Sequence, residues 1–178
     1  MNGLTLDFPQ PEHKTLWHRI LPLSAASLPL YAEVIRRSFA TVAQAFNLTR
    51  ENCPRHPSFY TNTDLEGRHG EDYFPFGYFE DNKLVGFVSL SRKSEGVFSL
   101  NNLAVLPEYR NKGYGESLLD FCRDKVKALG GNKIKIEIIG DNDVLRDWYI
   151  KKGYISTGTK RFEHLPFTVE FMEQEIEI

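Results

Sequence analysis

The sequence has little of what marks a disulfide-stapled, metal-binding or membrane-spanning protein. Its 178 residues include two cysteines, Cys53 and Cys122, which form neither a CxxC pair nor a metal-ligand spacing. No apolar run approaches the ~20 residues of a membrane span. The first residues carry no basic segment followed by an apolar stretch, so we expect no signal peptide. We therefore expect a cytoplasmic protein that uses no metal and folds around a hydrophobic core.

Charge of either sign is also not concentrated in this chain. The net charge is −2, and no dense run of lysine and arginine appears, so a nucleic-acid partner is not expected. The same weak charge argues against an acidic groove that reads highly basic peptides. The apolar fraction of 41% and the charged fraction of 26% are ordinary for a globular protein. We expect a single domain over residues 1–178, with a loose leader at 1–15.

Hydrophobic periodicity predicts alternating strands and helices. Residues 133–139 alternate polar and apolar side chains, as a half-buried strand does, and residues 115–129 show helical spacing that ends at Gly130 and Gly131. Ser27 is a candidate N-cap of the first helix. The expected strands are 16–22, 76–80, 83–91, 97–105, 133–139, 155–161 and 167–173, and the expected helices are 27–47, 63–68, 115–129 and 143–152.

This order predicts an α/β (α+β) fold, with a mixed, mostly antiparallel, twisted sheet of six to seven strands flanked by helices. The hairpin around Asp81-Asn82 supplies one antiparallel pair. Residues 48–75 are irregular and rich in proline and glycine. Such a stretch is either a functional binding loop or a surface connection, and the sequence leaves both open.

The segment with the clearest chemistry follows the strand at 97–105. Arg110-Asn111-Lys112-Gly113-Tyr114-Gly115 leads into a helix. Free amides at a helix start bind anions, and glycine lets a phosphate approach the backbone closely. The Rossmann fingerprint fails because Leu118 stands where its third glycine belongs, and the Walker loop is absent. The remaining pattern is R/Q-x-x-G-x-G/A after a strand that ends in L-x-V-x-P.

In this pattern the chain resembles the GNAT superfamily of N-acetyltransferases. The run from Leu103 to Gly115 is similar to that family's pyrophosphate-binding motif. A second stretch, with Asn142, Tyr149, Gly153 and Tyr154, resembles the family's N-x(6)-Y-x(3)-G-F/Y element. The resemblance is close over about residues 76–160, which it makes the acetyl-CoA-binding core. Residues 16–75 match in element order only, as the N-terminal strand, helices and acceptor-side loop, and residues 161–178 hold the C-terminal strand.

The resemblance implies an acetyl-CoA-dependent N-acetyltransferase in which a primary amine attacks the thioester directly, without a covalent enzyme intermediate. It implies that the backbone at 103–105 pairs with pantetheine and that amides at 110–115 hold the pyrophosphate. Tyr149 would be the catalytic residue, protonating the leaving thiolate as general acid. A backbone N–H near Val105 would stabilise the oxyanion. The implied cofactor-binding residues are Leu103, Ala104, Val105, Arg110, Asn111, Lys112, Gly113, Tyr114, Gly115 and Asn142.

One position departs from the family pattern. Many members carry a glutamate on the strand before the loop as the base, but the comparable residues here are Asn101 and Asn102, which cannot take a proton. These two asparagines are candidate substrate-side residues. The replacement base is then sought in the irregular segment, whose candidates are His56, Glu66, His69, Glu71 and Asp72.

The acceptor itself is not predicted beyond a primary amine on a small molecule or peptide. Aromatic residues of the irregular segment and of the C-terminal strands are candidate pocket walls: Phe59, Tyr60, Tyr73, Phe74, Phe76, Phe162, His164 and Phe167. A rival interpretation is a non-catalytic acyl-CoA-binding module, which the asparagines favour and Tyr149 opposes. A homodimer is plausible through an edge strand or the aromatic-rich surface.

Overall fold

The computed structural model describes residues 18–177, so the predicted leader and the start of the first predicted strand lie outside the described residues. The strands are β1 (His18–Pro22), β2 (Tyr73–Glu80), β3 (Lys83–Ser94), β4 (Val97–Val105), β5 (Lys133–Ile139), β6 (Ile155–Arg161) and β7 (Thr168–Glu175). The α-helices are α1 (Leu28–Ala45), α2 (Asn62–Glu66), α3 (Tyr114–Ala128) and α4 (Asp143–Lys151). Short 3-10 turns cover Ala25–Ser27, Pro57–Phe59 and Pro107–Tyr109.

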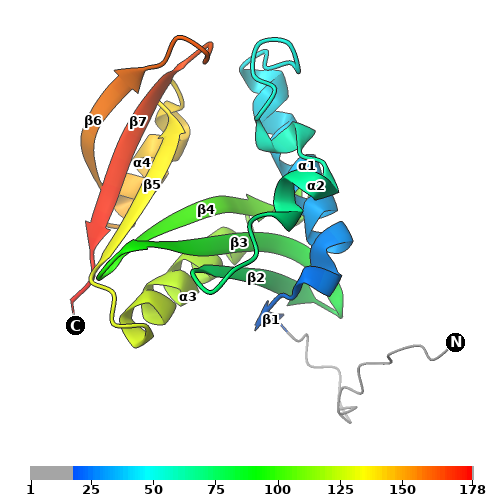
Figure 1. Cartoon of the computed structure of the whole chain (residues 1–178), viewed down its shortest axis with the longest axis vertical. Coiled ribbons are helices and arrows are strands. Elements are labelled where there is room, and N and C mark those ends of the chain that lie inside the picture. Colours follow the sequence, from blue (N-terminus) through cyan, green and yellow to red (C-terminus); the bar gives the residue numbers. More distant parts are fainter. Residues whose placement is uncertain (1–17, 178) are drawn as a thin grey trace, which may run out of the picture.

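The strands form one twisted sheet in the order β1-β2-β3-β4-β5-β7-β6 (Figure 1). Every neighbouring pair is antiparallel except β4 and β5, which are parallel and joined by α3. Parallel neighbours need a crossover connection, and a helix is the usual one. The predicted fold class, a mixed and mostly antiparallel sheet flanked by helices, is confirmed. Within residues 18–177, no helix is both long and apolar enough to cross a bilayer.

Helices α1 and α3 cover opposite faces of the sheet. Successive residues of a strand point to opposite faces, and β3 shows this directly. Phe87 stacks on Tyr31 of α1, with ring centroids 4.9 Å apart. The preceding residue, Gly86, lies so close to Leu118 of α3 that an added Cβ would sit 3.2 Å from that side chain. The main core therefore has two layers, one on each side of β2, β3 and β4.

Local sequence signals explain most element boundaries, but the predicted capping role of Ser27 was wrong. The β2–β3 turn uses Asp81 and Asn82 at positive φ, as a tight hairpin requires. Ser27 stands at the N-cap position of α1 but makes no capping hydrogen bond with its side chain. The reason is that Ser27 also ends the preceding 3-10 turn and has a helical backbone (φ −85°, ψ −1°) instead of the extended one a capping serine needs.

Candidate active site

The central feature of the site is the divergence of β4 and β5. The two strands pair only from Val97 to Ser99 on β4, and they then separate (Figure 1). A cavity of about 950 Å³ fills the opening. Its walls include β4 residues 99–105, β5 residues 135–139 and parts of α1 and α4. The β4 edge that faces β5 is thus left available to a ligand along the second half of the strand.

A β-bulge interrupts β4 beside this cavity. Val88 of β3 stands opposite two residues of β4, Asn102 and Leu103, because the register shifts between Phe87 and Ser89. Asn102 has a φ of 52°, in the left-handed region that asparagine tolerates better than most residues. A bulge bends its strand and redirects the following groups. The bulge lies in the part of β4 that no longer pairs with β5.

The loop after β4 has the geometry of an anion cradle. Gly113 has a φ of 81° and Asn111 a φ of 60°, so the chain turns sharply before α3. A Cβ placed on Gly113 would meet no atom within 4 Å, which shows open space above the backbone. The first intrahelical bond of α3 runs from the Ser117 N–H to the Gly113 carbonyl. The amides of Gly115 and Glu116 precede it in the first turn, where an α-helix supplies no intrahelical acceptor.

The two predicted cationic side chains of this loop have different surroundings. The Arg110 guanidinium donates to the Ser38 carbonyl (2.7 Å), Thr41 Oγ1 (3.0 Å) and the Val105 carbonyl (3.2 Å), and it so ties the loop to α1. Lys112 is nearly half exposed, and its Nζ lies 3.7 Å from Glu80. Lys112 is therefore the more exposed cation of the loop, while the Arg110 side chain holds the loop in position.

The Tyr114 side chain points away from the loop and into the core. Its ring stacks on Tyr78 of β2 with centroids 4.4 Å apart, and its hydroxyl donates to the Glu80 carboxylate. Burial and the nearby carboxylate raise the pKa of Tyr114. Only the backbone of Tyr114 is thus placed to meet a ligand at the helix start. Gly115 is less constrained, because an added Cβ would sit at ordinary contact distance, 3.9 Å, from Trp148.

Helix α4 brings the two residues of the second motif to the same cavity. Asn142 caps α4, and its Oδ1 accepts from the Leu145 N–H at 3.1 Å. Tyr149 is 5% exposed, and both residues line the cavity. Burial raises the pKa of Tyr149, so this phenol stays protonated at neutral pH. Its hydroxyl makes no hydrogen bond within residues 18–177.

The candidate bases of the irregular segment are placed unequally. His56 is buried and lines the cavity, and burial lowers its pKa to about 4. The His56 Nδ1 contacts Ser58 through its Oγ at 2.8 Å and its N–H at 3.4 Å. His69 bonds the Tyr31 hydroxyl through Nε2 at 2.6 Å, and Asp72 pairs with Arg92. Glu66 and Glu71 are exposed.

The two asparagines that replace the family's glutamate are both engaged. The Asn101 side chain donates to Ser91 Oγ at 3.1 Å and to the Ser99 carbonyl at 3.2 Å. The Asn102 Oδ1 accepts from Arg68 Nη1 at 3.2 Å. Both asparagines line the cavity. They form its polar rim on the sheet side.

The predicted aromatic walls are partly right. Tyr60 and Phe167 line the large cavity, and Tyr73 lines a smaller one beside it. Phe76 was misplaced: it packs edge-on against Phe121 of α3, with centroids 4.9 Å apart, on the other face of the sheet. Its position three residues after Tyr73 on the same strand puts the two side chains on opposite faces.

The lining residues that were missed in the sequence include Ser38, Arg68 and Lys93. Ser38 on α1 is buried, and its Oγ has no hydrogen-bond partner within the described part of the chain. Arg68 follows α2, and Lys93 lies near the end of β3. None of the three has a local signal, because each reaches the site through the way distant segments pack.

The family comparison supplies what geometry alone does not. Residues 39–154 match the family model described as Acetyltransferase (GNAT) family, which is more than half of the chain. The chain belongs to the GNAT acetyltransferase family. It is accordingly an acyltransferase, an enzyme of the acetyl-CoA-dependent N-acetyltransferase class. The family match favours this interpretation over the rival one, a non-catalytic module. The resemblance stated from the two motifs is confirmed.

Individual relatives are more distant. The streptothricin acetyltransferase of Escherichia coli is 26% identical over 122 residues, which are 68% of each chain. The PaiA N-acetyltransferase of Thermoplasma acidophilum, solved with coenzyme A, superposes with a TM-score of 0.76 at 23% identity over 90% of this chain and 99% of that one. The ribosomal-protein-S18-alanine N-acetyltransferase of Escherichia coli gives 0.74 at 19% identity, over 91% and 96%. These structures share the fold.

Proposed function

We propose that this enzyme moves the acetyl group of acetyl-CoA to a primary amine of a small molecule or peptide within a ternary complex. The observation that carries the proposal is the opening between β4 and β5. It places the edge of β4 beyond Ser99, Arg110 of the loop before α3 and Tyr149 along one cavity, and this loop leads directly into the start of α3. Each of these three features suits a different part of an acyl-CoA molecule.

The binding roles follow from the donors available. The backbone at Leu103, Ala104 and Val105 would pair with the pantetheine amides as an added strand does. The backbone at 110–115 would hold the pyrophosphate, with Lys112 supplying exposed positive charge. The Asn142 Oδ1 is used by its cap, so its amide group is the part left to contact pantetheine.

The chemical step needs three groups. The amine nitrogen attacks the thioester carbon, and a backbone N–H near Val105 would stabilise the oxyanion that forms. The carbon–sulfur bond then breaks, and Tyr149 donates its proton to the leaving thiolate. The amine loses one proton to solvent, and Tyr149 regains one, so an amide and the free thiol result. None of the candidate side-chain bases fits the proton-accepting role well.

Calorimetric titration with acetyl-CoA, followed by an amine panel, tests the proposal. Binding that weakens strongly when the pyrophosphate is missing from the analogue supports the loop assignment, and release of free thiol with an amine supports transfer. Binding without dependence on the pyrophosphate contradicts it. The acceptors named for the structural relatives range from a ribosomal-protein alanine to spermidine, so they do not choose one here. The cytoplasmic location and the homodimer stay predictions of the sequence.

A further inference from the structure

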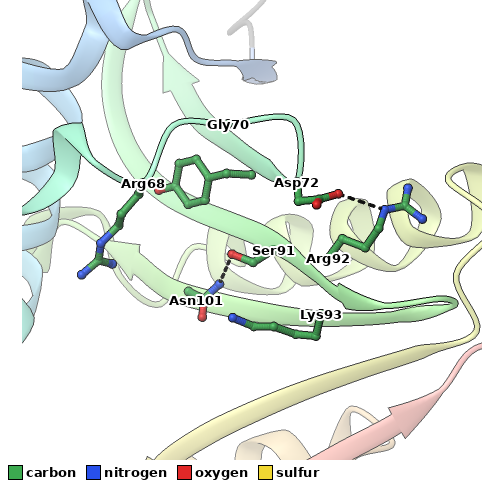
Figure 2. Close-up of a pocket in the computed structure, with 8 residues that line it drawn as sticks. Arg68, Gly70, Asp72, Ser91, Arg92, Lys93 and Asn101 are labelled. Carbon is green, nitrogen blue, oxygen red and sulfur yellow. Dashed lines mark hydrogen bonds and ion pairs between the residues drawn. The ribbon is translucent and has the colours of Figure 1, made fainter.

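A second, smaller cavity of about 370 Å³ opens beside Arg68, Lys93 and Asn101 (Figure 2). This end of the site, away from the loop at 110–115, is called the acceptor end. The smaller cavity shares Arg68, Lys93 and Asn101 with the large cavity, so the two are adjacent. Three cations line it, Arg68, Arg92 and Lys93, against a single carboxylate, that of Asp72. The Lys93 side chain extends back along the sheet toward Asn101 (Figure 2). The acceptor end is therefore richer in positive charge than the chain as a whole.

Only one of these three cations forms an ion pair within 4 Å, although Arg68 also helps to lower the pKa of the more distant Asp64 carboxylate. Asp72 lies 3.5 Å from the Arg92 Nε and accounts for that charge. Within residues 18–177, no carboxylate lies within 4 Å of Arg68 or Lys93. Arg68 is instead held in place by neutral groups: its Nη1 donates to Asn102, its Nε donates to the Asp64 carbonyl, and its guanidinium stacks 4.4 Å from the Tyr60 ring centroid. A stacked and oriented guanidinium is a ready site for an anion.

The remaining charges of the large cavity do not reverse this balance. Two carboxylates line it from the far wall, Glu137 of β5 and Glu173 of β7. Glu173 is paired with Lys133 at 2.9 Å. Lys135, two residues from Glu137 on the same strand, lines the cavity as well. The β4 side of the acceptor end thus stays positive.

The phosphates of the cofactor are not the anions these cations serve. Lys93 precedes β4, whereas the pyrophosphate loop follows it, and β4 has nine residues. The Lys93 side chain extends toward Asn101 (Figure 2), and at about 3.3 Å per residue Asn101 lies roughly 13 Å from the end of β4 at Val105, before the loop begins. An anion at Lys93 therefore belongs to another molecule in the ternary complex, and the acceptor is that molecule.

We propose that the acceptor carries an anionic group, a carboxylate or a phosphate, close to its amine, and that Arg68 and Lys93 bind this group. The inference rests on the proposed transfer function and names the substrate class for it. Polyamines are then poor acceptors, because the same two cations repel them. The two positive charges also favour the neutral form of an amine beside them. That neutral form is the nucleophile, which lessens the need for the glutamate that Asn101 and Asn102 replace.

Matched acceptor pairs test the proposal with one charge changed at a time. The pairs are glycine with glycinamide, β-alanine with β-alaninamide, and phosphoethanolamine with ethanolamine, with spermidine as the cationic probe. Free-thiol release gives kcat/KM for each. We expect the anionic member to be better by about 10–100-fold. The test is conservative, because a neighbouring negative charge makes an amine more basic and so less often neutral. The first two pairs report a carboxylate and the third a phosphate.

Substitutions assign the preference to the two cations. Lys93 is exposed, so Lys93→Gln should fold normally and should lower the anionic preference roughly tenfold, and Lys93→Glu should remove or reverse it. Arg68→Gln should act in the same direction. Lys127→Gln, an exposed lysine on α3, is the matched control and should leave the preference unchanged. Affinity for coenzyme A should be the same in all four variants.

Three results overturn the inference. If neutral amines or spermidine are acetylated as well as their anionic counterparts, the anion site is wrong while the transferase proposal stands. If the preference exists but persists in Lys93→Glu and Arg68→Gln, other residues bind the anion. If acetyl-CoA binds and no member of the panel accepts the acetyl group, the proposed transfer to small amines fails, and the inference fails with it.

Discussion

The two ends of β4 are built in different ways. The end that follows Val105 presents backbone: the amides at the start of α3 and Gly113, which has open space above it. The other end presents side chains from separate segments, with Arg68 after α2, Lys93 on β3 and Asn101 on β4. A site made of backbone groups needs residues that permit its backbone conformation. Such a site can therefore be predicted from a short sequence motif. A side-chain site needs only the right charges to meet in space.

The difference predicts how each end fails. The loop end should be sensitive to shape and to any added anion, and it should discriminate little among acceptors. The acceptor end should tolerate substitution structurally and should change specificity instead. The following experiments test this division, beginning with the largest expected effect.

Gly113→Glu should break the loop end. The substitution puts a carboxylate into the open space above Gly113 and strains a backbone at φ 81°. Two like charges about 4 Å apart in a partly desolvated site cost about 4 kcal/mol, or roughly 10³ in affinity for coenzyme A. Gly130→Glu is the matched control, because Gly130 also has a positive φ (74°) and nothing near its Cβ, at the far end of α3. Calorimetric titration of both variants decides; equal losses would show that strain alone is responsible.

Tyr149→Phe should separate chemistry from binding in the middle of the cavity. The ring keeps its packing against Trp148 and Tyr154, and only the hydroxyl is lost. We expect kcat to fall roughly 10²-fold or more while the affinity for acetyl-CoA stays within a few fold. Tyr154→Phe is the control, since that hydroxyl is buried without a hydrogen-bond partner in the described chain. An unchanged kcat in Tyr149→Phe would remove it from the mechanism.

His56 on the acceptor side offers a pH-dependent contrast. Its pKa is about 4 when buried and about 6.5 when the chain unfolds. Above pH 6.5 both forms are neutral, but on acidification the unfolded chain binds the proton first, so the free energy of unfolding falls between pH 6.5 and 4. His56 accounts for about 2 kcal/mol of this fall between pH 6.5 and 4.5.

Urea denaturation at the two pH values measures the effect. In His56→Asn, where the amide oxygen can still accept from the Ser58 N–H, the fall should be smaller by that amount. The exposed His164 provides the control, because His164→Asn should show the same fall in the free energy of unfolding between the two pH values as the wild type. Equal slopes in wild type and His56→Asn would show that His56 is not buried in its neutral form.

The same contrast explains what the sequence could and could not predict. The strands at 97–105 and 133–139 were predicted with the bounds the structure has, because their periodicity is local. β2 begins at Tyr73 instead of residue 76, since Pro75 in the middle of the run hid a strand that continues by pairing with β3. Phe76 was assigned to the wrong face for the same reason, because the phase of a strand cannot be fixed until its partner is known.

The side chains of the acceptor end had no such local signal. Arg68 becomes a candidate residue only when it stacks on Tyr60 and reaches the bulge at Asn102, and the second contact joins distant parts of the chain. Conversely, Arg110 lies in the motif, and the structure shows its guanidinium tying the loop to α1. The motif therefore predicted the backbone conformation of the loop better than it predicted the contacts of the loop's side chains.

The smallest expected effect separates the two roles of Asn142, which joins cap and ligand in one side chain. Asn142→Ala should lower the free energy of unfolding by about 1 kcal/mol, because the Leu145 N–H loses its acceptor. Asn142→Asp keeps a capping oxygen, favoured by the helix dipole, but removes the amide donor. We expect Asn142→Asp to fold as the wild type does and to bind coenzyme A several-fold more weakly. If both variants bind it normally, Asn142 is a cap alone, and the side chains of α4 contribute to the site through Tyr149.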